Sequence, residues 1–105
     1  MSLLYSSGEN LQNSLHDIRF AADAFDEALS QPEFLLVRGG FDCLERLSET
    51  FRRTSRELRS LARQAHQLSC PLVTSYVLDV RESVERALAR SARVNSELRD
   101  LNLGW

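Results

Sequence analysis

The segment CLERLSETFRR, residues 43–53, carries arginines at a spacing that suits binding to phosphate groups. All 13 cationic residues of this 105-residue chain are arginines, and the chain contains no lysine. A guanidinium group binds phosphate through two parallel hydrogen bonds and loses its hydration more readily than an ammonium group does. An all-arginine set therefore suits a polyanion such as nucleic acid, although a GC-rich gene or a second, overlapping reading frame would produce the same composition.

The charges are unevenly spread along the chain, although the formal net charge is only −2. Residues 9–33 carry six acidic residues and one arginine, whereas residues 34–70 carry seven arginines and four acidic residues. The remaining segment, residues 71–105, contains five of each. Because a polyanion responds to the local electrostatic field, the middle segment is the candidate binding region.

Side chains that support catalysis or metal binding are scattered. His16 and His66 have no cysteine or carboxylate at ligand or triad spacing in a recognisable motif, so we interpret both as surface histidines. Cys43 and Cys70 lie far apart and lack partners at metal spacing, which predicts free thiols in a reducing compartment. We therefore predict a protein that is not an enzyme, with no catalytic residues, no metal, no cofactor and no small-molecule substrate.

Three helices are predicted to position the arginines, because apolar residues recur at alternating steps of three and four. The first helix has Leu11, Leu15, Ile18, Ala22, Phe25 and Leu29 on one face. The second has Leu44, Leu47, Phe51, Thr54, Leu58, Leu61, Ala65 and Leu68 at the a and d positions of a heptad. The third has Val73, Val77, Val80, Val84, Ala87, Ser91, Val94, Leu98 and Leu101. The small residues in the middle of this third seam predict either a close approach of helices or a weakly packed stretch.

Local signals mark the ends of these helices. The first helix should end near Ser30, because a proline follows shortly after and Ser30 forms an S-x-x-E capping box with Glu33. The Gly39–Gly40 pair predicts a bend or a break, since two glycines cost about 2 kcal/mol relative to alanines inside a helix. Ser69 is a candidate cap, and Pro71 is tolerated in the first turn of the third helix.

These elements predict an all-α fold, in which the three-helix chain contains an antiparallel helical hairpin formed by the first and second helices. Two such chains would pair through their a and d seams into a dimeric four-helix-type bundle. Residues 1–8 would form a flexible N-terminal tail, and residues 9–105 a single helical domain. No apolar run approaches the roughly 20 residues of a membrane-spanning helix, and the start lacks a basic leader, so a cytoplasmic location is expected.

The heptad pattern of the second helix puts six arginines on its outer face. They are Arg52 and Arg59 at b, Arg46 and Arg53 at c, and Arg56 and Arg63 at f. Their row would be about 25 Å long. Without interleaved aromatic residues it suits a duplex backbone better than a single strand, and double-stranded RNA is recognised largely through its phosphates and 2′-hydroxyls. The alternative is a solvated face on which Glu45, Glu49 and Glu57 pair with neighbouring arginines.

The residues Cys43, Leu44, Arg46 and Arg53 resemble a C-L-x-[basic] motif, followed by a further arginine, that occurs in the nodavirus suppressors of RNA silencing. SLHDIRFAADAF is similar to the first helix of that family. CPLVTSYVLD is similar to the segment after the family's long helix, although its proline lies further from the cysteine here.

The resemblance implies an all-helical viral protein that dimerises into an antiparallel four-helix bundle and holds double-stranded RNA on one side. It also implies that Cys43 packs against the sugar–phosphate backbone and that Arg46 and Arg53 contact phosphates. Members of the family are encoded in a frame that overlaps the viral polymerase, which would explain the missing lysine.

We therefore expect a homodimer that binds double-stranded RNA in the host cytoplasm and suppresses RNA silencing by shielding the duplex from nucleases. The main expected RNA contacts are Arg46, Arg53, Arg56 and Arg63, followed by Arg52, Arg59 and Cys43. The competing interpretation is a protein-interaction subunit or adaptor, in which the apolar seams or the FLLV segment, residues 34–37, dock a partner helix.

Overall fold

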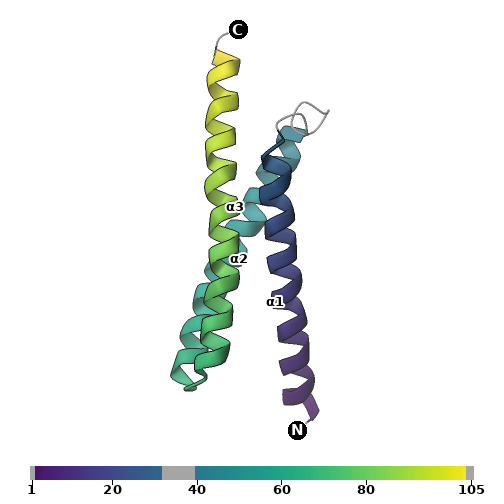
Figure 1. The fold of residues 1–105 in the computed structure, drawn as a ribbon, viewed down its shortest axis with the longest axis vertical. Helices are drawn as coiled ribbons and strands as arrows, with labels where there is room; N and C mark the ends of the chain where they lie inside the picture. Colours follow the sequence, from purple (N-terminus) through teal and green to yellow (C-terminus); the bar gives the residue numbers. More distant parts are fainter. Residues whose placement is uncertain (1, 32–39, 104–105) are drawn as a thin grey trace.

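The computed structural model describes residues 2–31 and 40–103 of the chain. They form three helices, α1 (Ser2–Leu29), α2 (Gly40–Gln67) and α3 (Pro71–Leu103) (Figure 1). No strand occurs within these two ranges, which confirms the all-α prediction. Helix α1 begins at Ser2 and so includes most of the segment that we expected to be a flexible tail.

The chain reverses direction at each connection between helices (Figure 1). Helix α2 packs closely against α3 as an antiparallel hairpin, and α1 lies beside α3 and runs in the same direction. The closely packed hairpin is therefore formed by α2 and α3 rather than by the first and second helices. The molecule is elongated, with principal extents of 60 × 21 × 17 Å, and the C-terminal part of α3 extends beyond the other two helices.

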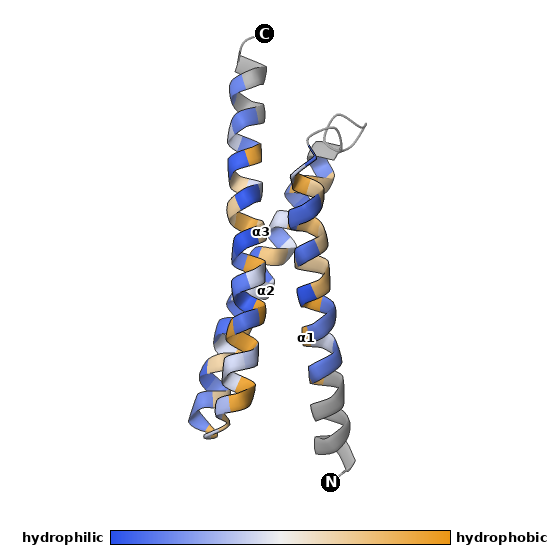
Figure 2. Cartoon of the chain, in the orientation of Figure 1, coloured by the Kyte–Doolittle hydropathy of each residue, from blue (hydrophilic) through white to orange (hydrophobic). Residues whose placement is uncertain are grey.

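All three helices contribute buried apolar side chains to one core. These are Leu15, Ala22, Phe25 and Leu29 of α1, Leu44, Phe51, Leu58, Ala62 and Ala65 of α2, and Val77, Val80, Val84 and Ala87 of α3. Phe25 and Phe51 stack with their ring centroids 5.2 Å apart, so α1 also touches α2. Figure 2 shows apolar and hydrophilic segments alternating along the helices, as amphipathic helices packed on a shared core require.

The buried seam of α2 is centred on the a and e positions rather than on a and d. The e positions Ser48, Ser55 and Ala62 are buried together with the a positions. At d, in contrast, Leu47, Thr54 and Leu61 are only half-buried. Leu68, the last predicted d residue, is 75% exposed. Because the side chains at e are small, the backbone of α3 can approach α2 on this side, and the distance between packed helices follows the size of the residues at their contact.

The seam of α3 largely matches its prediction. Val77, Val80, Val84, Ala87 and Ser91 are buried. The hydroxyl groups of Ser48 and Ser91 form a hydrogen bond across the interface of α2 and α3, which confirms the close approach of helices at this level. Val73 is 39% exposed, so the seam begins later than expected. The side chains of Leu98 and Leu101 lie outside the described part of the structure.

The joint between α2 and α3 is a Schellman-type helix end. The backbone N–H of Cys70 donates to the carbonyl of Ala65, and that of Ser69 to the carbonyl of His66, both at 3.0 Å. Ser69 has a left-handed backbone with φ of 56°, so it caps the end of α2. Helix α3 then begins at Pro71, at the position where a missing N–H costs nothing.

The other predicted break lies mostly outside the described residues. Helix α1 ends at Leu29, which agrees with the predicted end near Ser30, and α2 begins at Gly40, the second residue of the glycine pair. The hydroxyl of Ser30 donates to the carbonyl of Glu27 at 2.6 Å. The partner of Ser30 in the predicted capping box, Glu33, is not among the described residues.

Replacing Ser69 by glycine should stabilise the protein. A β-carbon makes the left-handed backbone at Ser69 unfavourable by about 1–2 kcal/mol, and the greater freedom of glycine in the unfolded chain offsets part of the gain. We expect the free energy of unfolding to rise by about 0.5–1 kcal/mol, measured by urea denaturation followed by circular dichroism. The matched control is Ser75→Gly, an exposed position inside α3, which should lower stability by a similar amount. A lower urea midpoint for Ser69→Gly would contradict the role of Ser69 as a cap.

Candidate nucleic-acid interface

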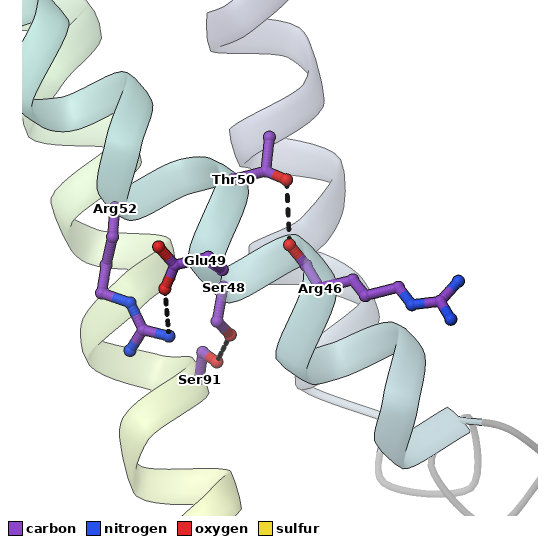
Figure 3. Close-up of polar contacts among 6 residues, drawn as sticks. All are labelled: Arg46, Ser48, Glu49, Thr50, Arg52 and Ser91. Carbon is purple, nitrogen blue, oxygen red and sulfur yellow. Dashed lines mark hydrogen bonds and ion pairs between the residues drawn. The ribbon is translucent and has the colours of Figure 1, made fainter.

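Helix α2 leaves its predicted arginine stripe uncovered. The exposed residues of this stripe are Arg46, Arg52, Arg53, Arg56, Arg59 and Arg63. With 3.6 residues per turn, the c positions lie on the opposite side of the helix from a seam at a and e. Arg46 and Arg53 occupy c positions and therefore point furthest from the core. Figure 3 shows the side chain of Arg46 extending away from α3.

Some arginines of the stripe lie beside α3, and the others face away from it. Arg52, Arg56 and Arg59 line a hollow of about 310 Å³ between α2 and α3, together with Arg81 of α3 and the carboxylates of Glu49 and Glu85. We call the three arginines of α2 the groove row. Arg46 and Arg53 share their c positions with the exposed Ser60, and we call Arg46, Arg53 and Ser60 the outward row. Arg63 follows Arg56 by seven residues, on the same side of α2, but lies outside the hollow.

A second hollow, of about 790 Å³, continues the groove toward the start of α2. Ser48, Leu88, Ser91 and Asn95 contribute to its lining. Three carboxylates and a single arginine also border it, namely Glu45, Glu49, Glu85 and Arg52. This part of the groove does not favour a polyanion, whereas four arginines line the smaller hollow together with the carboxylates of Glu49 and Glu85.

Only one residue of the arginine stripe forms an ion pair within the described ranges, 2–31 and 40–103. The guanidinium of Arg52 lies 3.3 Å from the carboxylate of Glu49, and more than half of each side chain is exposed. Such an exposed pair contributes less than about 1 kcal/mol, so Arg52 can exchange Glu49 for a phosphate at little cost. Glu45 and Glu57, which the solvated-face interpretation expected to pair with arginines, form no ion pair in this part of the chain.

Carboxylates on α1 and α3 are paired with arginines outside the stripe. Glu85 lies 3.3 Å from Arg81 and accepts a hydrogen bond of 2.5 Å from Ser55. Asp26 lies 2.7 Å from Arg90 and joins α1 to α3. These pairs leave the outward row without an acidic partner among the described side chains, so its positive charge is available to a ligand.

Cys43 lies one turn before Arg46, on the same side of α2, and its thiol is free and exposed. Cys70 is also free and exposed, which confirms the predicted free thiols. His16 and His66 are exposed, as expected of surface histidines. The described residues contain no group of three or more His, Cys, Asp or Glu side chains placed to hold a metal ion. No helix in the same part of the chain has an apolar stretch long enough to cross a membrane.

Two features of the interface were missed by sequence reasoning. Arg81 belongs to α3 but joins the groove row, because α3 crosses α2 at that level. The sequence around Arg81 does not indicate that this residue lies beside the arginines of α2, because its position depends on how α3 packs against α2. The buried serines Ser48 and Ser55 were not among the predicted core residues. Their seven-residue spacing on the side of the apolar seam was the available signal.

No protein-family model, no curated protein and no solved structure matches this chain. The charge, exposure and shape of α2 are therefore the observations that bear on what this surface could bind. A row of exposed guanidinium groups on a straight helix can donate many hydrogen bonds to anionic oxygens, and it provides neither a nucleophile nor a general base.

Proposed function

We propose that this protein binds double-stranded RNA without catalysing a reaction on it, and that it suppresses RNA silencing by shielding the duplex from host nucleases. The observation that carries the proposal is the uncovered arginine stripe of α2. Between Arg52 and Arg63 the helix has five arginines and one acidic residue, Glu57. This segment is about 17 Å long. Such a density of positive charge attracts a polyanion even though the whole chain is slightly acidic.

The composition of the stripe favours a duplex over a single strand. Single-strand binding usually needs exposed aromatic rings on which bases stack, and Phe51, the only aromatic residue between residues 46 and 63, is buried in the core. The arginine side chains suit phosphate oxygens, and no other side chain of the stripe is placed to read base edges in a groove. Recognition would therefore follow the shape and charge of the A-form helix, with little preference for sequence.

A homodimer is also part of the proposal. The a and d residues through which two chains were expected to pair mostly pack within a single chain, so dimerisation must use a different surface. Exposed apolar side chains are available at Phe20, Leu68, Leu72 and Leu78. Sedimentation or light scattering, with and without duplex RNA, measures the mass directly. A monomer under both conditions would remove the dimer from the proposal and leave RNA binding untouched.

RNA binding is tested by gel-shift titration with a duplex RNA at two salt concentrations. The logarithm of the binding constant falls by about 0.9 per phosphate contact for each tenfold rise in salt on duplex DNA. If four arginines contact phosphates, affinity should fall about a hundredfold between 50 and 200 mM salt. A single-stranded RNA of the same sequence serves as the control and should bind more weakly. Absence of a duplex shift at low salt would sink the proposal.

Shielding is tested separately, by digesting the duplex with a nuclease specific for double-stranded RNA. Saturating protein should slow the cleavage in proportion to the fraction of duplex bound, and a silencing reporter in host cytoplasm should then recover expression. Cleavage at an unchanged rate on fully bound duplex would contradict shielding while leaving binding in place.

A second candidate function is that of an adaptor in a helical complex. The observation in its favour is the apolar surface around the joint between α2 and α3, where Leu68 is 75% and Leu72 is 86% exposed. A partner helix that covered both leucines would bury enough apolar area for weak association. The FLLV segment, which also favoured this candidate, lies outside the described residues. The adaptor would be favoured if the parent does not bind duplex RNA and if a Leu68→Ser/Leu72→Ser variant no longer associates with a partner helix that binds the parent.

A further inference from the structure

The hydroxyl groups on α2 differ in whether they are free to contact a ligand. They belong to Ser48, Thr50, Thr54, Ser55 and Ser60. Ser48 is buried and is hydrogen-bonded to Ser91 of α3. Ser55 is also buried and donates to the carboxylate of Glu85 at 2.5 Å. These two serines hold α2 against α3 and are withdrawn from the surface.

The two threonines are engaged with the backbone of their own helix. The hydroxyl of Thr50 donates to the carbonyl of Arg46, and that of Thr54 to the carbonyl of Thr50, both at 2.9 Å. Figure 3 shows the first of these bonds along the side of α2. Ser60 is exposed and forms no such bond to any residue within 2–31 and 40–103. Among the hydroxyls of α2, that of Ser60 is therefore the exposed one whose O–H donates to no group of the described residues.

Ser60 also lies where a ligand of the stripe would pass. It occupies the outward row with Arg53, seven residues away, and so faces directly away from the core. Arg56 and Arg63 lie one turn before and after it on neighbouring positions, and Arg59 precedes it. A short side chain thus sits among long cationic ones. A strand whose phosphates engage the arginines would bring its riboses against the short residue between them.

Serine and arginine offer different chemistry to a ribose. A guanidinium group only donates hydrogen bonds and binds the phosphates of RNA and DNA alike. A serine hydroxyl donates and accepts, as the ribose 2′-hydroxyl does, and the 2′-hydroxyl is the group by which a protein distinguishes RNA from DNA. We propose that Ser60 contacts a ribose 2′-hydroxyl and sets the preference of this protein for RNA duplexes over DNA duplexes. This inference rests on the proposed binding of double-stranded RNA.

The test compares the affinities of RNA and DNA duplexes of one sequence for the parent and for Ser60→Ala. Loss of one hydrogen bond corresponds to a factor of about three to ten in the dissociation constant. We expect Ser60→Ala to weaken RNA binding by this factor and to leave DNA binding unchanged, so that the RNA-to-DNA affinity ratio falls. Ser60→Thr, which keeps a hydroxyl, should retain most of the ratio. Alanine is a better helix former than serine, so the fold is preserved.

The matched control is Ser14→Ala, which removes an exposed hydroxyl from α1 and should leave both affinities unchanged. An unchanged RNA-to-DNA ratio in Ser60→Ala, or an equal loss on both duplexes, would overturn the role of Ser60 and leave RNA binding standing. Failure of the parent to bind an RNA duplex would instead overturn the proposed function. The two failures are thereby distinguished in one set of titrations.

Discussion

Replacing Arg46 and Arg53 together by glutamine should weaken the binding of duplex RNA by about a hundredfold or more. Both arginines lie in the outward row, furthest from the core and without an acidic partner among the described residues. A hydrogen bond to a charged group contributes about 1.5–3 kcal/mol, so the loss of two phosphate contacts corresponds to a factor of about 10² to 10⁴. Glutamine keeps a long polar side chain and a good helix propensity, so the effect should fall on binding rather than on folding.

A matched control removes the same amount of charge elsewhere. Arg19 of α1 and Arg93 of α3 are exposed, and neither belongs to the stripe. Arg19→Gln/Arg93→Gln should change the affinity only a few-fold, through the weaker long-range attraction. Circular dichroism and solution mass should be the same for the parent and both double variants. If Arg46→Gln/Arg53→Gln binds like the parent, the outward row is not the contact surface, even if the chain does bind RNA.

Replacing Phe51 by alanine should remove about 3–5 kcal/mol of the free energy of unfolding. Phe51 is 7% exposed and stacks on Phe25, so its ring joins α2 to α1 in the centre of the core. A domain of this size has a total stability of about 5–15 kcal/mol, and the variant should therefore be close to unfolding at room temperature. Urea denaturation followed by circular dichroism measures the loss, which should appear as a much lower midpoint.

Phe20→Ala is the control for this variant. It makes the same chemical change on α1, but Phe20 is 71% exposed. Surface substitutions usually change stability by less than about 0.5 kcal/mol, so the midpoint of Phe20→Ala should stay near that of the parent. Equal midpoints for the two variants would mean that Phe51 is not in the core and that the packing of α1 described above is wrong.

The positions of the helices could be predicted from the sequence because their signals are local. Seven-residue apolar spacing gave three helices, and the structure has them between residues 2 and 103. Pro71 marked the first residue of α3, and the glycine pair marked the start of α2. These signals act within one or two turns of the chain, so they hold whatever the helices pack against.

The orientation of the helices depends on contacts between distant residues, and here the sequence was less informative. The small side chains of Ser48 and Ser55 allow α3 to pack against the e side of α2. The apolar heptad pattern had instead predicted a seam at the a and d positions. Leu68 was predicted to be buried, but the Schellman-type end places it beyond the last turn of α2, in solvent. Because α3 packs against the e side of α2, the groove row lies beside α3 and the outward row does not. Which arginines belong to which row could therefore not be predicted from the sequence.

The paired serines of α2 have a consequence for ligand binding. Ser48 with Ser91 and Ser55 with Glu85 join the same two helices at two separate levels. Sliding α3 along α2 by one turn would break both hydrogen bonds, and a buried serine left without a partner costs about 1–3 kcal/mol. The two hydrogen bonds therefore favour one alignment of the hairpin, in which Arg81 of α3 is already placed beside the groove row, while the helix itself fixes the spacing of the guanidinium groups along α2. A ligand that matches this spacing loses little affinity to ordering the backbone that receives it.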